Sequence, residues 1–460
     1  MPRTAPRATA ALSRRLVLRG ALAAAVLAPA RGWAQAAGPA PEALVLAVSD
    51  LHAGWRQTPR LLAALRAARA RHPGVPAVFV VNGDLFERGN RAALRSGGAP
   101  DWAFLAALAA EGPVLMTLGN HEAALDADLA AVVARAEGVG VQPVGGVIDA
   151  RRGRFFAPVS ARLGLGGRRL GALALAPDNP FVWRPAVRPF VTLPDPVALA
   201  RDAGPGAFAG ADFPLLLSHA GVPADKRLLG DLPEGTAVIG GHSHVSFAHA
   251  DARLGYAHCG AWGTHLTLGL LRAGEAPRLE VLAAADLADR DDPALAEVVA
   301  ATLAEHLDPE DRAVVAVRDT ALDLPASVLL AAEAVRAAAD ADAALLGHTT
   351  FGQPLAAGPM TRFDFDAYLR FDGRVMTAQV PAETLAVILS RANQHRAVGL
   401  DARTGDYAHA TELAIRPGRT YRIAVNDWLA RNQRAYLGVE GLDFAEVPGL
   451  SLRAVTLAAL

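Results

Sequence analysis

Short apolar runs alternate with amphipathic stretches in the first half of the chain. Five of these runs are rich in Leu or β-branched residues and are bounded by Gly, Pro or Asp, which is typical of buried strands; they span residues 43–49, 75–81, 112–118, 212–218 and 236–241. Residues 59–71 have helical spacing, with Leu61, Leu62 and Leu65 on one face, and residues 126–136 also favour a helix. Strands that alternate with helices predict a layered α/β domain.

The pattern changes after residue 285. A more charged helical stretch covers residues 293–306 and is followed by a second set of elements: helices at 327–340 and 382–392, and strands at 343–346, 375–380 and 421–425. A chain of 460 residues is too long for one ordinary core. We therefore predict a first domain at 37–285, a linker helix within 286–311 and a second domain at 312–460.

The first 36 residues look like a targeting segment rather than part of the fold. They carry six arginines and no acidic residue, and residues 13–19 resemble a twin-arginine export signal. The apolar run at 21–28 is too short to span a bilayer, and Ala34-Gln35-Ala36 has the form of a cleavage site. We therefore expect residues 1–36 to direct export by the twin-arginine machinery to the periplasm.

Composition and charge limit what kinds of partner the chain is expected to bind. The chain is 52% hydrophobic and 20% charged, as globular proteins are, and without residues 1–36 its formal charge falls from -1 to about -7. A mildly acidic chain without a basic cluster argues against binding a nucleic-acid polymer. No later stretch is long and uncharged enough to predict a stable membrane span. The single cysteine, Cys259, excludes an internal disulfide.

Metal-ligand side chains follow all five predicted strands of the first domain. They are Asp50 and His52 after the first strand, Asp84 after the second, Asn120 and His121 after the third, His219 after the fourth, and His242 and His244 after the fifth. In open α/β layers the carboxyl ends of the strands meet at one crevice. Carboxylates and imidazoles suit divalent ions such as Mn, Zn, Fe or Co, and a bridging carboxylate can hold two of them. A single Asp after a strand is often only a helix cap, but five such coincidences in one chain are improbable.

The order Asp-x-His, Gly-Asp, Gly-Asn-His-Glu, His, Gly-His-x-His resembles that of the calcineurin-like metallophosphoesterases, and within them the 5'-nucleotidase branch. The resemblance implies a four-layer α/β/β/α sandwich with a C-terminal α+β substrate domain. It also implies two divalent metal ions with Asp84 as the bridging ligand. One ion would be held by Asp50, His52, Asp84 and His244, and the other by Asp84, Asn120, His219 and His242. The metals themselves (Mn, Zn, Fe or Co) are left open.

The same resemblance assigns catalytic roles. A metal-bound hydroxide would attack the phosphorus atom, and His121 would protonate the leaving oxygen as general acid. Members of the family have an Asp three residues after that His, where this chain has Ala124. Two carboxylates could orient His121 instead. We prefer Glu87, in a Gly-Asp-x-x-Glu-Arg-Gly run similar to that of related phosphatases, over Asp126.

The second domain resembles the 5'-nucleotidase substrate domain but departs from it where nucleotides are held. His348 replaces an Asn that reaches toward the active site, and the Arg that would grip an anionic group is missing. An aromatic side chain, Tyr436, is kept where family members stack on a base. The resemblance therefore implies a substrate site made of Asn120, His121, His348 and Tyr436.

Together these features predict a periplasmic two-metal hydrolase of a small phosphoester: a 5'-nucleotidase-like phosphomonoesterase or a cyclic-nucleotide phosphodiesterase. One alternative is a thiosulfohydrolase-like enzyme for sulfur-containing substrates, which the altered second domain would permit. Another is a non-catalytic periplasmic binding protein on the same fold, although the complete ligand set argues against that. The sequence leaves the oligomeric state open.

Overall fold

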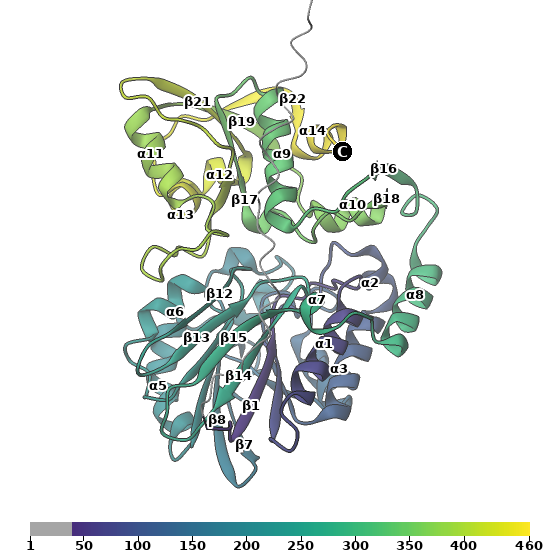
Figure 1. Cartoon of the computed structure of the whole chain (residues 1–460), viewed down its shortest axis with the longest axis vertical. Coiled ribbons are helices and arrows are strands. Elements are labelled where there is room, and N and C mark those ends of the chain that lie inside the picture. Colours follow the sequence, from purple (N-terminus) through teal and green to yellow (C-terminus); the bar gives the residue numbers. More distant parts are fainter. Residues whose placement is uncertain (1–38) are drawn as a thin grey trace, which may run out of the picture. The chain divides into compact units, whose positions relative to one another are not determined.

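The computed structural model describes residues 39–460, so the predicted export signal at 1–36 lies outside the described residues. In residues 41–283 the buried strands form two six-stranded sheets (Figure 1). The first has the order β15-β14-β1-β2-β3-β4, formed by β1 (Ala43–Val48), β2 (Ala77–Val81), β3 (Val114–Thr117), β4 (Gln142–Val144), β14 (His265–Leu271) and β15 (Arg278–Ala283). The second has the order β12-β13-β11-β10-β8-β7, formed by β7 (Ser160–Leu165), β8 (Arg168–Leu175), β10 (Phe213–Ser218), β11 (Ala237–Gly240), β12 (Ser246–Ala250) and β13 (Gly255–Cys259).

These two sheets pack face to face and carry helices on their outer faces. Alternate residues of the central strands, such as Val45, Leu115 and Leu215, are fully or almost fully buried between the sheets. A second apolar layer joins the first sheet to α1 (Thr58–Ala70), α3 (Ala99–Glu111), α4 (Leu129–Gly138), α7 (Ala284–Leu287) and α8 (Pro293–His306). A third joins the other sheet to α5 (Pro196–Phe208) and α6 (Val222–Leu228). The predicted four-layer α/β/β/α arrangement is therefore confirmed.

Residues 314–460 contain a separate mixed sheet. Its order is β20-β17-β21-β19-β22, formed by β17 (Ala343–Gly347), β19 (Arg374–Pro381), β20 (Ala408–Ala410), β21 (Thr420–Asn426) and β22 (Ala445–Ser451). Apolar clusters cover both faces. The surrounding helices are α9 (Leu324–Ala338), α10 (Arg362–Tyr368), α11 (Ala382–Arg391), α12 (Asp427–Arg431), α13 (Gln433–Leu437) and α14 (Leu452–Ala458). This is the α+β C-terminal part that the resemblance implied.

Smaller elements complete the described chain. They are α2 (Arg91–Ser96), the pair β16 (Val314–Arg318) and β18 (Gly358–Thr361), and the three-stranded sheet of β5 (Ile148–Asp149), β6 (Arg154–Phe155) and β9 (Val191–Thr192). Helix α8 has the predicted bounds. Two other helices start elsewhere because of their caps: the side chain of Asp128 accepts from the amide of Ala130, so α4 begins at Leu129, and the Asp323 cap lets α9 begin at Leu324.

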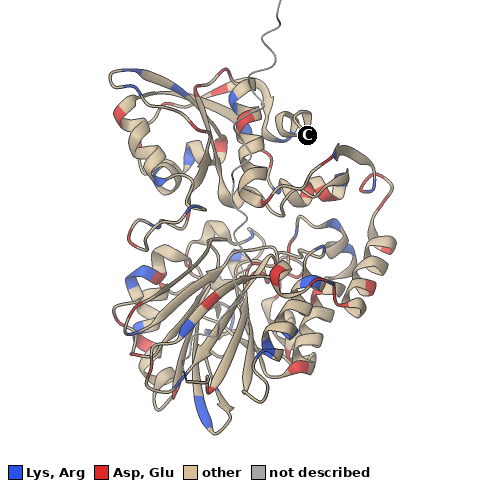
Figure 2. Cartoon of the chain, viewed as in Figure 1, with Lys and Arg blue, Asp and Glu red and all other residues tan. Residues whose placement is uncertain are grey.

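Residues 41–460 form one compact unit that includes both groups of sheets. Figure 2 shows basic and acidic residues interspersed along both groups rather than basic residues gathered on one of them. Within residues 39–460, no helix has the length and apolar character needed to cross a membrane.

Candidate metal and catalytic site

The loops that follow β1, β2, β3, β10 and β11 meet at one end of the sandwich. Strands β1, β2 and β3 are parallel neighbours in the first sheet, and β10 and β11 are parallel neighbours in the second. A hydrogen bond joins the loops of the two sheets: the amide of His242, after β11, donates to Asp50 Oδ1, after β1, at 3.0 Å. The side chains that the sequence places after these strands therefore converge, as expected for the carboxyl ends of parallel strands.

The backbone at this end of the sandwich is unusually constrained. Nine non-glycine residues in the described part of the chain have positive φ, and five of them are predicted metal ligands, with φ between 48° and 71°: Asp50, His52, Asp84, His242 and His244. Side chains other than glycine adopt this region only where the surrounding structure over-determines it, and such residues gather at functional sites. These positive φ values therefore indicate that the loops orient ligand side chains, and do not only connect one strand to the next element.

One group of ligand atoms lies where the first metal is expected. Asp50, His52 and His244 each offer a ligand atom, and these atoms all lie within 4.8 Å of one another. The Nε2 atoms of the two histidines are 2.9 Å apart, and His244 Nε2 is 3.4 Å from Asp50 Oδ1. All three residues are buried. Burial lowers the pKa of His52 to about 3, with Arg370 as the next cause, so its ring stays neutral and can coordinate a cation.

A second group, Asp84, His219 and His242, lies where the second metal is expected. His219 Nδ1 donates to the carbonyl of Asn82 at 2.7 Å, which leaves Nε2 facing Asp84 Oδ2 at 3.1 Å. Burial disfavours charge on this ring, but Asp84 and Asp50 outweigh it and raise the pKa of His219 to about 10. The carboxylates thus attract positive charge here, and a divalent cation could take the place of the proton.

Two further observations fit a pair of cations. Asp84 Oδ2 lies 3.8 Å from His52 Nε2 as well as close to His219, so this carboxylate stands between the two groups, as a bridging ligand must. Asn120 Oδ1 is buried without a hydrogen-bond partner among the described residues, while its Nδ2 donates to Val182 O at 3.2 Å. A buried acceptor of this kind is costly unless something binds it. The residues present therefore fit two divalent metal ions.

His121 stands at the open side of this group. Its side chain is 24% exposed, its ring meets that of His52 edge-on at 4.7 Å, and its backbone amide donates to Asp84 Oδ1 at 2.7 Å. Glu87 Oε2 lies 3.5 Å from His121 Nδ1. Asp126, the other candidate for orienting His121, is exposed and accepts from the amide of Asp128 instead. The structure brings Glu87, and not Asp126, next to the predicted general acid.

The two predicted substrate residues of the second domain, His348 and Tyr436, are more buried than His121. His348 is buried; its Nε2 donates to the carbonyl of the predicted metal ligand His244 at 2.9 Å, and its Nδ1 accepts from the hydroxyl of Tyr407 at 2.9 Å. Tyr436 is 6% exposed, with its hydroxyl 3.3 Å from the indole nitrogen of Trp428. His348 thus reaches the catalytic loops, whereas Tyr436 belongs to the core of the C-terminal sheet. Their roles in substrate binding stay predictions.

Two residues of this site were not assigned a role from the sequence. Glu122 is fully buried and accepts from the amides of Gly119, Asp84 and Leu85 at 2.6, 3.0 and 2.9 Å. Its presence in the Gly-Asn-His-Glu motif was a signal, but its partners lie partly on another loop. Arg370 forms an ion pair with Glu87, and no sequence signal indicated this contact.

Known proteins resemble this chain in sequence over one domain and in fold over nearly all of it. The family model for calcineurin-like phosphoesterases matches residues 43–246. A 5'-nucleotidase precursor from Thermus thermophilus has 19% identity and a TM-score of 0.57, covering 90% of this chain and 95% of that one. The sulfate thiohydrolase SoxB of the same organism has 16% identity and a TM-score of 0.61, covering 92% and 94%. A 5'-nucleotidase from Candida albicans has 12% identity and a TM-score of 0.55, covering 92% and 98%.

No curated protein sequence matches the chain. These three structural neighbours are below 25% identical, so they establish the two-part fold and not a substrate. The family model, in contrast, covers the segment that supplies every predicted metal ligand. Residues 43–246 therefore match a calcineurin-like phosphoesterase domain, which supports a metal-dependent phosphoester hydrolase.

Proposed function

We propose that the chain is an exported phosphoester hydrolase of the 5'-nucleotidase type, which acts as a phosphomonoesterase on a small phosphomonoester or as a phosphodiesterase on a cyclic nucleotide. This proposal rests on one observation: seven ligand-type side chains from five loops lie close together, and His121 lies beside them. Export by the twin-arginine route to the periplasm is part of the proposal and rests on residues 13–36 of the sequence.

The residues of the site divide the chemistry between them. Two divalent ions held by these ligands would supply Lewis-acid stabilisation of phosphoryl charge and a nucleophile at neutral pH. Asn120 offers a polar side chain at the same place, and its neighbour His121 offers an imidazole that is partly open to solvent. His121 is suited to give a proton to the leaving oxygen, since Glu87 faces its Nδ1 and can accept that N–H, which leaves Nε2 to donate its proton when the ring is protonated.

The choice of substrate depends on the C-terminal part. By the resemblance, Tyr436 corresponds to an aromatic residue that stacks on a base and His348 replaces an Asn that reaches toward the active site, but the Arg that would grip an anionic group is missing from that turn. We therefore place phosphomonoester chemistry above nucleotide specificity, and we expect activity on simple aryl and alkyl phosphates as well as on nucleotides.

A panel of substrates tests this proposal. Metal-loaded protein would be assayed with p-nitrophenyl phosphate, bis-p-nitrophenyl phosphate, nucleoside monophosphates and cyclic nucleotides, with metal content measured by elemental analysis. Asp84→Asn should abolish activity by removing the bridging ligand, whereas Asp126→Asn, which changes an exposed carboxylate nearby, should leave it within about twofold. If the loaded wild-type protein cleaves none of these esters, or if Asp84→Asn retains full activity, the proposal is wrong.

The same panel separates the alternatives. A thiosulfonate-modified peptide thiol added to it would release sulfate only if the enzyme acts on sulfur-containing substrates. Metal and ligand binding without turnover of any compound would indicate a binding protein. For the location, a fusion of residues 1–36 to a reporter should be exported, and changing Arg14 and Arg15 to Lys should stop its export.

A further inference from the structure

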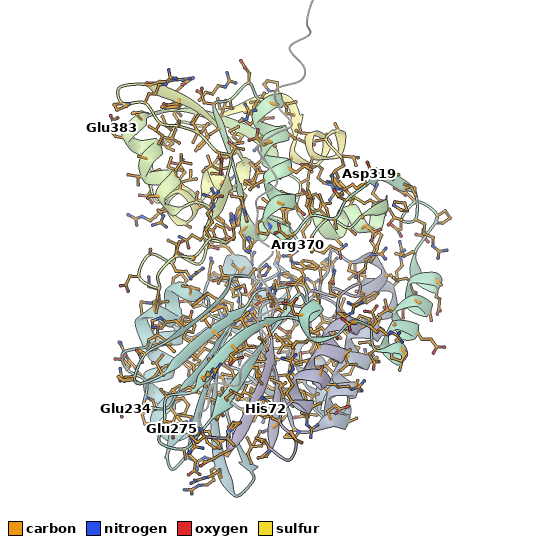
Figure 3. All side chains as sticks on the ribbon, viewed as in Figure 1. His72, Glu234, Glu275, Asp319, Arg370 and Glu383 are labelled. Carbon is orange, nitrogen blue, oxygen red and sulfur yellow. The ribbon has the colours of Figure 1, made fainter. Side chains whose placement is uncertain are left out.

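Arg370 is a cation that the C-terminal part contributes to the catalytic site. It lies between α10 and β19, and Figure 3 labels it where the two groups of sheets meet. Its side chain is only 6% exposed and forms an ion pair with Glu87, itself 9% exposed. A buried ion pair needs close geometry to offset the cost of desolvating both groups, so this contact fixes the positions of both side chains.

Aromatic rings hold Arg370 from the other sides. Its guanidinium carbon lies 5.2 Å from the centre of the Trp262 ring and 5.0 Å from that of Phe371. Trp262 in turn stacks on the metal ligand His52, with ring centres 5.3 Å apart and planes 27° apart. Trp262 is itself one of the residues with positive φ. A chain of contacts therefore leads from Arg370 to the metal site through Trp262, beside the direct one through Glu87.

The carboxylate that Arg370 holds is shared with the two central histidines. Glu87 Oε2 faces Arg370 and lies 3.4 Å from His52 Nδ1 and 3.5 Å from His121 Nδ1, while Oε1 accepts from the amide of Gly89 at 2.8 Å. With only the hydrogen bond from the Gly89 amide to Oε1, the carboxylate could still rotate and move Oε2 away from the two rings. The ion pair with Arg370 removes that freedom and keeps Oε2 directed at the two rings.

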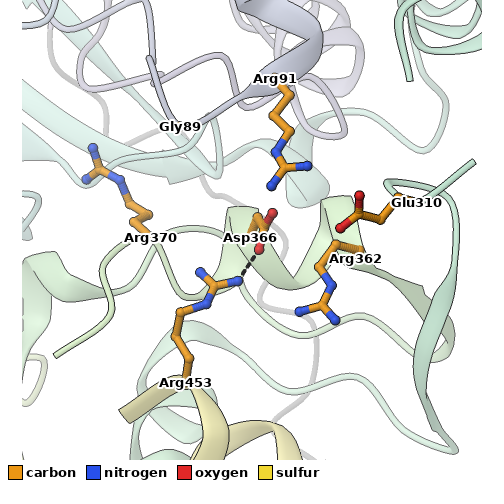
Figure 4. Close-up of a pocket in the computed structure, with 7 residues that line it drawn as sticks. All are labelled: Gly89, Arg91, Glu310, Arg362, Asp366, Arg370 and Arg453. Atoms are coloured by element: carbon orange, nitrogen blue, oxygen red, sulfur yellow. Dashed lines mark hydrogen bonds and ion pairs between the residues drawn. The ribbon is translucent and has the colours of Figure 1, made fainter. Parts of the chain in front are cut away.

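Other arginines lie nearby but do not reach Glu87. Arg370 borders a cavity of about 480 Å³ that is also lined by Arg91, Arg362 and Arg453. In Figure 4, Arg370 extends toward the segment around Gly89, whereas Arg453 pairs with Asp366. Arg91 pairs with Asp311, and Arg362 forms no side-chain ion pair within residues 39–460. Arg362 is thus a matched control: the same residue type, on the same cavity, without contact to Glu87.

We propose that Arg370 is a positioning residue, which holds the Glu87 carboxylate against His121 so that the C-terminal part completes the catalytic site. This inference rests on the proposed function, in which His121 protonates the leaving oxygen. It has a specific consequence for substrate dependence. An alkoxide leaving group needs the proton, whereas p-nitrophenolate is stable without it, so loss of Arg370 should slow the two kinds of ester unequally.

The test compares kcat and KM for p-nitrophenyl phosphate and glycerol 2-phosphate, with metal-loaded full-length protein. We expect Arg370→Ala and Glu87→Gln each to lower kcat for glycerol 2-phosphate by roughly 10-fold or more, and kcat for p-nitrophenyl phosphate by less than about 3-fold. Arg362→Ala should leave the ratio of the two unchanged. The double variant Glu87→Gln/Arg370→Ala should have a kcat for glycerol 2-phosphate no lower than that of the less active single variant. Both changes remove the same contribution, the positioning of His121 by the Glu87 carboxylate.

The other outcomes are equally clear. An equal fall for both esters, or additive effects in the double variant, would overturn the proposal and leave Arg370 as a packing residue only. If Arg370→Ala does not fold, Arg370→Met keeps a long unbranched side chain at this position and removes the charge, and the same ratio of kcat values tests the proposal. Wild-type protein that cleaves neither ester would instead refute the proposed function, so the two failures can be told apart.

Discussion

At the scale of single residues, Glu122 shows how one buried carboxylate can align two loops. It accepts backbone amides from the β3 loop at Gly119 and from the β2 loop at Asp84 and Leu85. Burial raises the pKa of Glu122 to about 7, with the neighbouring Asp84 adding to the effect. The amides need an acceptor on each oxygen, and the ionised carboxylate supplies it without a competing donor.

Glu122→Gln should therefore misplace Asp84. An amide turns one acceptor into an NH₂ group that opposes backbone N–H donors, which costs about 1–3 kcal/mol of folding stability. We expect metal affinity to fall by roughly 10- to 100-fold, as for changes to residues that support metal ligands. Metal titration followed by calorimetry, with denaturant unfolding, would measure both effects. Glu137→Gln, at an exposed site on α4, is the control, and equal behaviour of the two variants would contradict this role.

The convergence of the candidate site residues was predictable where their position after a strand fixes their place. Asp50, Asp84 and His219 directly follow, or closely follow, buried strands, and parallel strands bring their carboxyl ends together in any such fold. Arg370 was not predictable, because its contact with Glu87 joins positions 283 residues apart across two sheets. The same holds for the burial of Tyr436, which depends on packing around α13 rather than on local pattern.

At the scale of elements, the strands with continuous apolar runs were the readily predicted ones. Strands β1, β10 and β11 are buried on both faces, so their sequences are almost wholly apolar. Strand β12 alternates between exposed and half-buried residues at the edge of its sheet, and its sequence gives a weaker signal. Helix starts were displaced by about three residues because capping by Asp128 and Asp323, not periodicity, sets the first turn.

Gly119, in the turn that follows β3, has no room for a side chain. A Cβ added at Gly119 would lie 2.4 Å from Asp84 Oδ1 and 2.9 Å from Glu122 Oε2, which is too close for any real contact. Gly119→Ala should push these carboxylates apart and lower kcat/KM by roughly 100-fold or more, about the effect of a 1 Å misplacement. Steady-state kinetics of metal-loaded protein would show this.

Gly138→Ala provides the comparison for Gly119. It ends α4, and a Cβ there meets nothing within 4 Å. The substitution should leave activity unchanged and stability equal or slightly higher, since Ala favours the helix over Gly. Loss of activity in both variants would mean that steric crowding at Asp84 is not the cause.

At the scale of the whole molecule, the candidate metal site lies where the two large sheets meet. Its ligands come from three loops of the first sheet and two of the second, and His348 links the C-terminal part to the carbonyl of His244. The described chain thus places two buried carboxylates, Asp50 and Asp84, at the junction. Burial raises the pKa of Asp50 to about 7; His219 opposes the rise and Asp84 adds to it. Without a cation, Asp84 is paired with the His219 ring, and the cost of bringing the two carboxylates together falls on Asp50.

Chelation should therefore lower the melting temperature of the wild-type protein by several degrees. Cations that bind only the folded state stabilise it by about 4 kcal/mol at roughly a thousandfold excess over Kd, and reloading should restore the loss. Asp84→Asn should melt below the chelated wild type, because it leaves the buried His219 ring without its nearest carboxylate partner, and it should gain little from added metal. Scanning calorimetry with and without chelator measures both, and Asp126→Asn should respond as the wild type does. If the wild type melts at the same temperature after elemental analysis confirms metal removal, the cations do not hold the two sheets together, and the ligand loops must be stable by their own hydrogen bonds.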